Sequence, residues 1–212
     1  MLYFEDEDSD QDLLNILLTD DYLTELPGEV SGELPDILRD AGFSVTEKEG
    51  EDLTVTVRDL SGLGVVSKKR VPSAMRALGT LNEPLFRRGL MNCIFHTKRE
   101  VVEDLGSLPF SWFDPDISCY LETDNRINGF LLIHRLPSGS LRVEFLSAYG
   151  PDARTDLMFM IRFSILQAMK LCSEDIKVIL RRHDEVARNL TGYLFPGKKG
   201  EPCLYGERAE GQ

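Results

Sequence analysis

Four cysteines and three histidines are the side chains of this sequence best suited to bind a metal ion or act as nucleophiles. No CxxC pair occurs among the cysteines, and both residue types are scattered along the chain: Cys93, Cys119, Cys172, Cys203, His96, His134 and His183. A zinc site needs three or four ligands that the fold brings together. We therefore expect free thiols, typical of a cytosolic protein, and no metal site.

Other short motifs that carry chemistry are incomplete. The alternating aspartates of Asp6–Asp12 resemble a calcium loop, but Gln11 and Leu17 stand where the loop needs glycine and glutamate. Gly62 and Gly64 form only a fragment of a dinucleotide-binding loop, and neither GxxxxGK[ST] nor Gly-x-Ser-x-Gly occurs. These motifs therefore give no support to phosphate-loop nucleotide binding or to a serine hydrolase.

The charge of the chain is unevenly distributed. The formal net charge is −12 over 212 residues. Residues 1–60 carry −15 and residues 61–212 carry +3, while residues 61–100 alone carry +6. A basic segment beside an acidic one favours contact within the chain over nucleic-acid binding. We expect the acidic part to dock on the basic part.

The sequence also bears on location and partners. It shows neither a long uncharged apolar run nor the basic start of a signal peptide. We therefore expect a cytoplasmic protein without a membrane partner, and nucleic acid is an improbable partner on the charge argument. Whether the chain forms a homodimer stays open.

The first sixty residues contain two helix patterns and a hairpin pattern. Apolar spacing predicts a short helix over residues 11–24. Pro35 and Gly42 suit the start and the end of a second helix. Two β-branched runs, 43–46 and 53–58, flank a charged stretch around Gly50, and together they predict a β-hairpin.

The clearest pattern is a three-stranded meander in the second half of the chain. Strands are predicted at 118–122, 127–134 and 141–149, with turns at Asp124-Asn125 and around Gly139. A helix that is apolar nearly all round follows to about Cys172, and it must be buried on most sides. A strand at 176–180, a helix at 184–190 and a strand at 202–207 complete the order. The fold class is α/β (α+β), with a mixed, mostly antiparallel sheet flanked by helices.

This order of elements resembles the GNAT superfamily of acyl-CoA-dependent N-acyltransferases over roughly residues 112–207. The resemblance implies that the third meander strand ends in a bulge, at Phe145–Tyr149, whose backbone binds the pantetheine arm. It also implies that the following loop and helix start cradle the pyrophosphate of acetyl-CoA or another acyl-CoA. The implied cofactor-binding residues are Leu146, Ser147, Ala148, Tyr149, Gly150, Arg154 and Thr155.

The resemblance further implies transfer of an acyl group to an amine acceptor, and whether this acceptor is a small molecule or a protein stays open. Glu144 is the candidate base, and it shares a predicted strand face with Arg142 and Leu146, opposite Leu141, Val143 and Phe145. The alternative for Glu144 is a cross-strand ion pair with a residue such as Arg135. Tyr193, after the second helix, is the candidate acid, although a buried aromatic covering the sheet edge explains it equally well.

The loop Gly150–Thr155 departs from the family pattern. Pro151 removes an amide donor, and Asp152 adds negative charge where two phosphates would sit. The alternative function is therefore a non-catalytic GNAT-like binding or interaction module that has lost acyl-CoA binding.

The expected division of the chain has three parts. Residues 1–60 form an acidic part, and the segment 34–60 resembles the closing helix and strands of a preceding module of the same superfamily. Residues 61–111 form a basic helical connector, and residues 112–212 form the GNAT-like domain.

Overall fold

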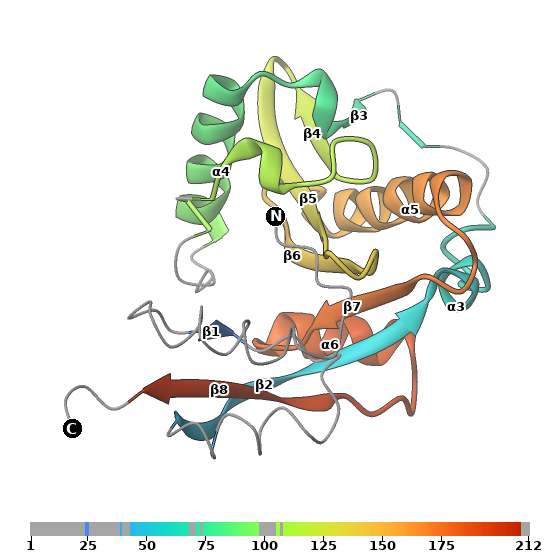
Figure 1. Cartoon of the computed structure of the whole chain (residues 1–212). Coiled ribbons are helices and arrows are strands. Elements are labelled where there is room, and N and C mark those ends of the chain that lie inside the picture. Colours follow the sequence, from blue (N-terminus) through green and yellow to red (C-terminus); the bar gives the residue numbers. More distant parts are fainter. Residues whose placement is uncertain are drawn as a thin grey trace.

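One eight-stranded sheet organises the molecule (Figure 1). The computed structural model describes residues 24–25, 39, 43–67, 71–72, 74–97, 105–106 and 108–208. Neighbouring strands follow the order β1-β8-β2-β7-β6-β5-β4-β3, and among the strands of these described residues only β6 and β7 pair in parallel. The strands are β1 Thr24–Glu25, β2 Phe43–Thr56, β3 Met75–Ala77, β4 Cys119–Thr123, β5 Arg126–Arg135, β6 Leu141–Ala148, β7 Lys177–Arg181 and β8 Glu201–Arg208. The predicted mixed, mostly antiparallel sheet is confirmed.

Helices cover both faces of the sheet. They are α3 Val57–Ser61, α4 Glu83–Thr97, α5 Ala153–Leu171 and α6 Glu185–Leu194, with 3-10 turns at Leu78–Thr80 and Phe110–Trp112. On one face, Met160 and Ile165 of α5 pack against strand residues such as Leu131. On the other, Phe86 of α4 packs against Phe130. Each face thus has its own apolar core, and α4 and α5 lie on opposite sides of the sheet (Figure 1).

The predicted order of elements in the second half of the chain is confirmed. The meander β4–β5–β6, the helix α5, the strand β7, the helix α6 and the strand β8 follow one another as expected. The turn residues Asp124 and Asn125 have φ of 53° and 58°, and Gly139 has φ of 85°. Such left-handed backbone suits asparagine, aspartate and glycine, which explains why these turns were readable from the sequence.

The predicted hairpin at residues 43–58 is wrong. Residues 43–56 form one long strand, β2, which pairs with β8 through Asp52 and with β7 from Asp52 to Thr56. Gly50, with φ of 121°, lies in a register shift between Lys48 and Glu51. The glycine therefore accommodates a bulge within the strand, where the sequence pattern had indicated a turn.

Strand β2 joins the N-terminal part of the chain to the rest of the sheet. It lies between β7 and β8, so residues 43–56 and the meander belong to the same sheet. Of the helix predicted at 11–24, only Thr24 is described, and it belongs to strand β1 instead of a helix. Of the predicted helix that starts at Pro35, only Arg39 is described, and it is helical. The docking of the acidic part on the basic segment, its origin as a repeat and the three-part division stay predictions.

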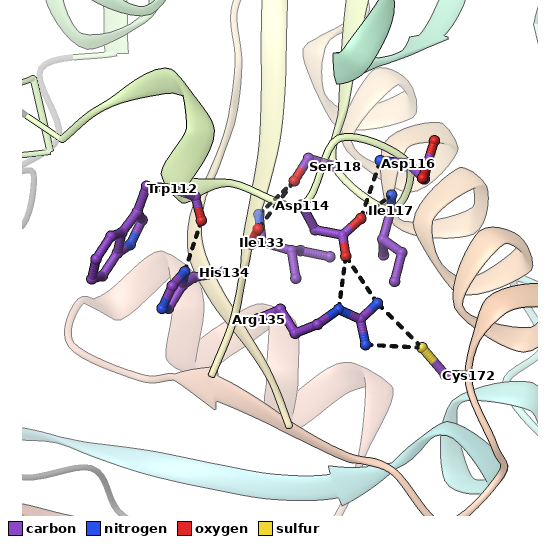
Figure 2. A network of polar contacts seen from close by, with 9 residues as sticks. All are labelled: Trp112, Asp114, Asp116, Ile117, Ser118, Ile133, His134, Arg135 and Cys172. Carbon is purple, nitrogen blue, oxygen red and sulfur yellow. Dashed lines mark hydrogen bonds and ion pairs between the residues drawn. The ribbon is translucent and has the colours of Figure 1, made fainter. Parts of the chain in front are cut away.

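A network of polar contacts fixes the start of the meander (Figure 2). The Asp114 carboxylate accepts hydrogen bonds from the backbone N–H groups of Asp116 and Ile117, and from the guanidinium of Arg135 at 2.9 and 3.1 Å. The Ser118 hydroxyl exchanges hydrogen bonds with the backbone of Ile133. These contacts hold the turn at residues 114–117 against β5.

The end of β5 carries a stacked pair of rings. The indole of Trp112 lies parallel to the imidazole of His134 at 3.9 Å between ring centroids, and Nδ1 of His134 lies 2.7 Å from the carbonyl oxygen of Trp112 (Figure 2). Burial lowers the pKa of His134, and the charge of Arg142 acts in the same direction, while the bond to Trp112 opposes it. His134 therefore serves this structural contact.

Three further expectations concern thiols, metals and membranes. Cys93, Cys119 and Cys172 are free, and burial raises the pKa of both Cys93 and Cys119 to about 12. Within the described ranges, no three His, Cys, Asp or Glu side chains gather as metal ligands. Among the helices that the structure describes, none is long and apolar enough to span a bilayer.

A capping box links the end of β2 to helix α3. Thr56 and Asp59 exchange hydrogen bonds between side chain and backbone, and Lys198 lies 3.0 Å from the Asp59 carboxylate. The bond from the Thr56 backbone lowers the pKa of Asp59 below its usual 3.8, and Lys198 adds to this. The capping box thus fastens the first turn of α3 directly after the strand.

We expect Asp59→Asn to lower the free energy of unfolding at pH 7 by about 0.5 kcal/mol, because it removes a negative charge from the first turn of α3 and from the exposed pair with Lys198. Because the folded pKa lies below the unfolded one, the folded state binds fewer protons between the two values. The contribution is therefore present above pH 3.8 and lost as the pH falls through the folded pKa. Urea unfolding at pH 7 and pH 3 measures this, and an equal loss at both values would contradict it.

Candidate functional site between β6 and β7

The two parallel strands at the centre of the sheet separate soon after they meet. β6 and β7 pair only from Leu141 with Val178 to Val143 with Leu180. On its other edge, β6 pairs with β5 along its whole length, with a register shift in which Phe145 faces Leu132 and Val143 faces Ile133. Glu144 is thus the extra residue of a β-bulge, at the point where the parallel strands part.

The bulge corrects two expectations about β6. It lies at Glu144, one residue before the predicted stretch of 145–149. Beyond the extra residue, the side chains of β6 point to the faces opposite to those predicted. Val143 and Leu146 both contact the core on the α5 side, whereas Phe145 belongs to the core on the α4 side. The predicted alternation is therefore wrong, because a single inserted residue reverses the side-chain direction of the rest of a strand.

A cavity of about 510 Å³ lies between the separating strands and the helices α5 and α6. Most of its lining side chains are apolar, from Leu146 and Leu180 on the strands to Leu157 and Ile161 on α5. Its polar lining residues are Glu144, Ser164, Arg181, His183, Asp184 and Thr191. A mostly apolar pocket with few polar groups is the usual form of a small-molecule site.

The polar groups inside the cavity are engaged within the protein. The Ser164 hydroxyl donates to the Ile117 carbonyl at 2.6 Å, and the Thr191 hydroxyl donates to the Ala187 carbonyl at 2.7 Å. The Asp184 carboxylate caps α6 by accepting from the backbone N–H of Ala187. The interior therefore presents hydrocarbon more than free donors and acceptors.

A charged cluster lies where the strands part. It consists of Glu144 and Arg142 of β6, Arg181 of β7, Asp52 of β2 and His183 after β7. Arg142 contacts one oxygen of Glu144 at 2.6 Å, and Arg181 contacts the other at 3.1 Å. Nε2 of His183 lies 3.4 Å from Asp52. Three strands that are distant in the sequence thus bring five titratable groups together.

Glu144 is the most buried carboxylate of the charged cluster. Its side chain is 5% exposed, and burial raises its pKa, while the charge and hydrogen bond of Arg142 oppose that shift. The ion pair that we predicted for Glu144 as the alternative to a catalytic role is present, but its partners are Arg142 and Arg181. Arg135, the partner named from the sequence, pairs with Asp114 instead.

The predicted cofactor-binding residues of β6 fall on both faces of the sheet. Leu146 lines the cavity, and Ala148 contacts the same core. Ser147 is buried. Tyr149 turns to the α4 side, where its ring stacks on His96 and its hydroxyl donates to the Ile127 carbonyl. Gly150 follows with φ of 116°.

A second hollow adjoins the first half of α5. Its lining includes Arg154, Thr155 and Arg162 of α5 together with Tyr193 of α6. The structure therefore brings together three predicted site residues, Arg154, Thr155 and Tyr193. Tyr193 is 75% exposed, so it does not cover the sheet edge as a buried aromatic.

Two carboxylates stand close to this hollow. Asp152 precedes α5 without capping it through its side chain, and Asp156 lies in its first turn. Burial raises the pKa of Asp156, and the charge of Asp152 adds to that shift. Both charges weaken the attraction of a helix N-terminus for a phosphate.

His183 is a candidate functional residue that the sequence did not single out. It lines the cavity, contacts the Asp52 carboxylate and packs beside Gly50, where an added Cβ would lie 2.9 Å from the imidazole. Asp52 and His183 are far apart in sequence, and only the pairing of Asp52 with Arg181 brings them together.

We expect Glu144→Ala to lower the free energy of unfolding by about 3 kcal/mol or more, because two buried guanidinium groups lose their carboxylate. Glu174→Ala is the matched control, since it removes an ion pair with Arg58 in which both side chains are at least 65% exposed. That control should cost less than about 1 kcal/mol. Urea denaturation measures both, and similar values would contradict a structural role for the Glu144 pairs.

Comparisons with known proteins agree on the fold. No protein-family model matches the sequence, and no curated protein matches it. Among solved structures, the L-PGS structure from Bacillus licheniformis is 11% identical, with a TM-score of 0.51 over 84% of this chain. A Drosophila protein is 9% identical, with a TM-score of 0.50 over 88%. A GCN5-related N-acetyltransferase from Kribbella flavida is 14% identical, with a TM-score of 0.47 over 83%.

The chain spans 66%, 59% and 64% of the lengths of these three structures, in that order. At such identities the likeness concerns the fold alone. Within the chain, the meander, helix α5 and the parallel pair β6–β7 follow the order of elements expected of a GNAT-like fold. The chain therefore has a GNAT-like fold.

Proposed function

We propose that the chain binds an acyl-CoA and transfers its acyl group to an amine. The observation that carries this proposal is the cavity beside the bulge, where β6 and β7 separate. In the expected geometry of the fold, the pantetheine arm lies along β6, so Leu146 and Leu180 would flank it. Bound acyl-CoA would supply the thioester, whose C–S bond breaks as the C–N bond to the amine forms.

The second hollow supports binding of the phosphate end of the ligand. Arg154 and Arg162 offer guanidinium groups, and Thr155 offers a hydroxyl beside the start of a long helix. The phenol of Tyr193 lines this second hollow and does not line the cavity proposed for the thioester, so it fits a contact with the phosphate end better than the predicted role of acid at the thiolate. These groups fit the anionic end of acyl-CoA, although Asp152 and Asp156 reduce the attraction.

We assign the base to His183, with Glu144 as a positioning residue. Both oxygens of Glu144 already contact guanidinium groups, whereas Nε2 of His183 lies 3.4 Å from the Asp52 carboxylate and its ring lines the cavity. An imidazole can take up a proton near neutral pH. In this proposal His183 takes the proton of the amine, and Glu144 holds Arg142 and Arg181 in place.

A second candidate function is a non-catalytic binding module. Pro151 and the carboxylates of Asp152 and Asp156 favour it, because they weaken the loop and helix start that would hold a pyrophosphate. The two candidates differ in whether CoA esters bind at all.

We expect calorimetric titration to show acetyl-CoA binding, and Asp152→Asn to tighten it several-fold, because one repulsive charge beside the phosphates disappears. The control is Asp175→Asn, which removes the same charge beyond the other end of α5. It should leave the affinity unchanged. Absence of binding at millimolar acetyl-CoA, in both the unaltered chain and Asp152→Asn, would leave only the non-catalytic module.

We expect His183→Gln to lower kcat by at least 100-fold with little change in KM, in an assay of CoA release with a panel of amines. The pH profile of kcat/KM should also lose the limb that reports the base. Glu144→Gln keeps the shape of the side chain and serves as the comparison. If Glu144→Gln abolished activity at normal stability while His183→Gln stayed active, the base would be Glu144, as the sequence predicted.

A further inference from the structure

We propose that the cavity selects a medium-chain acyl group of about eight carbons. This inference rests on the proposed function and specifies its substrate. The cavity does not end at the bulge where the strands part. Leu141 and Val178, which are paired partners before the separation, also line it, together with Ile165 and Ala168 in the second half of α5.

The geometry of the strands gives the length of this inner part. β6 and β7 run in parallel, and α5 connects them, so the C-terminal half of α5 lies near the paired ends of the strands. From Glu144 to Leu141 the strand advances three residues, or about 10 Å. A fully extended peptide backbone advances about 3.6 Å over the three bonds of each residue, or about 1.2 Å per bond. An extended acyl chain advances by about the same distance per bond. The inner part therefore accommodates about eight bonds beyond the charged cluster.

The chemistry of the walls favours a hydrocarbon over a polar group. Around the inner part, the side chains come from both sheet and helices: Leu60, Leu141, Ile165, Ala168, Val178 and Phe195. Ser164 of α5 also lines the cavity, but it donates its hydroxyl proton to the Ile117 carbonyl. A polar acyl group would lose its hydration without gaining matching hydrogen bonds.

The charged residues at and after the end of β7 mark the opposite end of the cavity. Arg181 ends β7, and His183 and Asp184 follow it, on the side where the strands have separated. Glu144 lies between the two parts. A ligand with a polar head and an apolar tail therefore fits in one direction, with the thioester beside the charged cluster and the tail towards Ala168.

An acetyl group would leave this inner part empty. Removal of each methylene from water contributes roughly a fourfold gain in affinity when it is fully buried. We therefore expect octanoyl-CoA to bind at least tenfold more tightly than acetyl-CoA to the unaltered full chain. Palmitoyl-CoA, below its micelle concentration, should gain nothing further, because its tail exceeds the available length.

The cavity itself can be shortened by substitution. Ala168→Leu adds three carbons to the wall of the inner part, and it should lower the ratio of octanoyl-CoA to acetyl-CoA affinity at least fivefold. Ala77→Leu is the matched control, because Ala77 lies on the edge strand β3 and does not line the cavity. It should keep the ratio. Thermal unfolding of both variants establishes that they fold, and the chain-length series on the unaltered protein tests the proposal independently of them.

The experiment is titration of acetyl-, butyryl-, octanoyl- and palmitoyl-CoA, with free octanoate as a further probe. Equal affinity for acetyl-CoA and octanoyl-CoA would overturn the chain-length inference and leave the proposed function standing. Octanoate binding that is weakened in Ala168→Leu, without binding of any CoA ester, would support the apolar subsite and overturn the proposed function. Absence of binding by all five probes would overturn both.

Discussion

The separation of β6 from β7 is the constraint on which the rest of the site depends. Two adjacent parallel strands satisfy each other's backbone groups and would normally bury the space between them. Here the pairing stops after three residues, at the inserted Glu144. The helices α5 and α6 then span a gap that the strands alone cannot close, and the cavity is the result.

The same bulge brings together two otherwise separate properties of the site. It directs Leu146 towards α5, so that the cavity is apolar, and it places the Glu144 carboxylate between the guanidinium groups of Arg142 and Arg181. A buried carboxylate costs free energy unless it is paired. The guanidinium groups of Arg142 and Arg181 thus offset the free-energy cost of burying the Glu144 carboxylate at the bulge.

Local patterns in the sequence were sufficient for the meander and for α5. Alternating side chains, turn residues with left-handed backbone, and an apolar helix all act over a few residues. The features that the sequence did not predict depend on the pairing of strands that are distant in the sequence. Gly50 resembled a turn residue, but β8 pairs with both sides of it. The bulge at Glu144 depends on the register with β5, and the approach of His183 to Asp52 depends on the pairing of β2 with β7.

The position of β2 between β7 and β8 has a consequence for how the chain folds. Its two partner strands begin at Lys177 and Glu201, more than a hundred residues later in the sequence. During synthesis, both edges of β2 therefore stay unpaired with their partner strands until β7 and β8 have emerged from the ribosome. Closure of such a long loop slows folding, and an unpaired strand can associate with other chains in the meantime. β2 is thus synthesised more than a hundred residues before the strands that pair with its two edges.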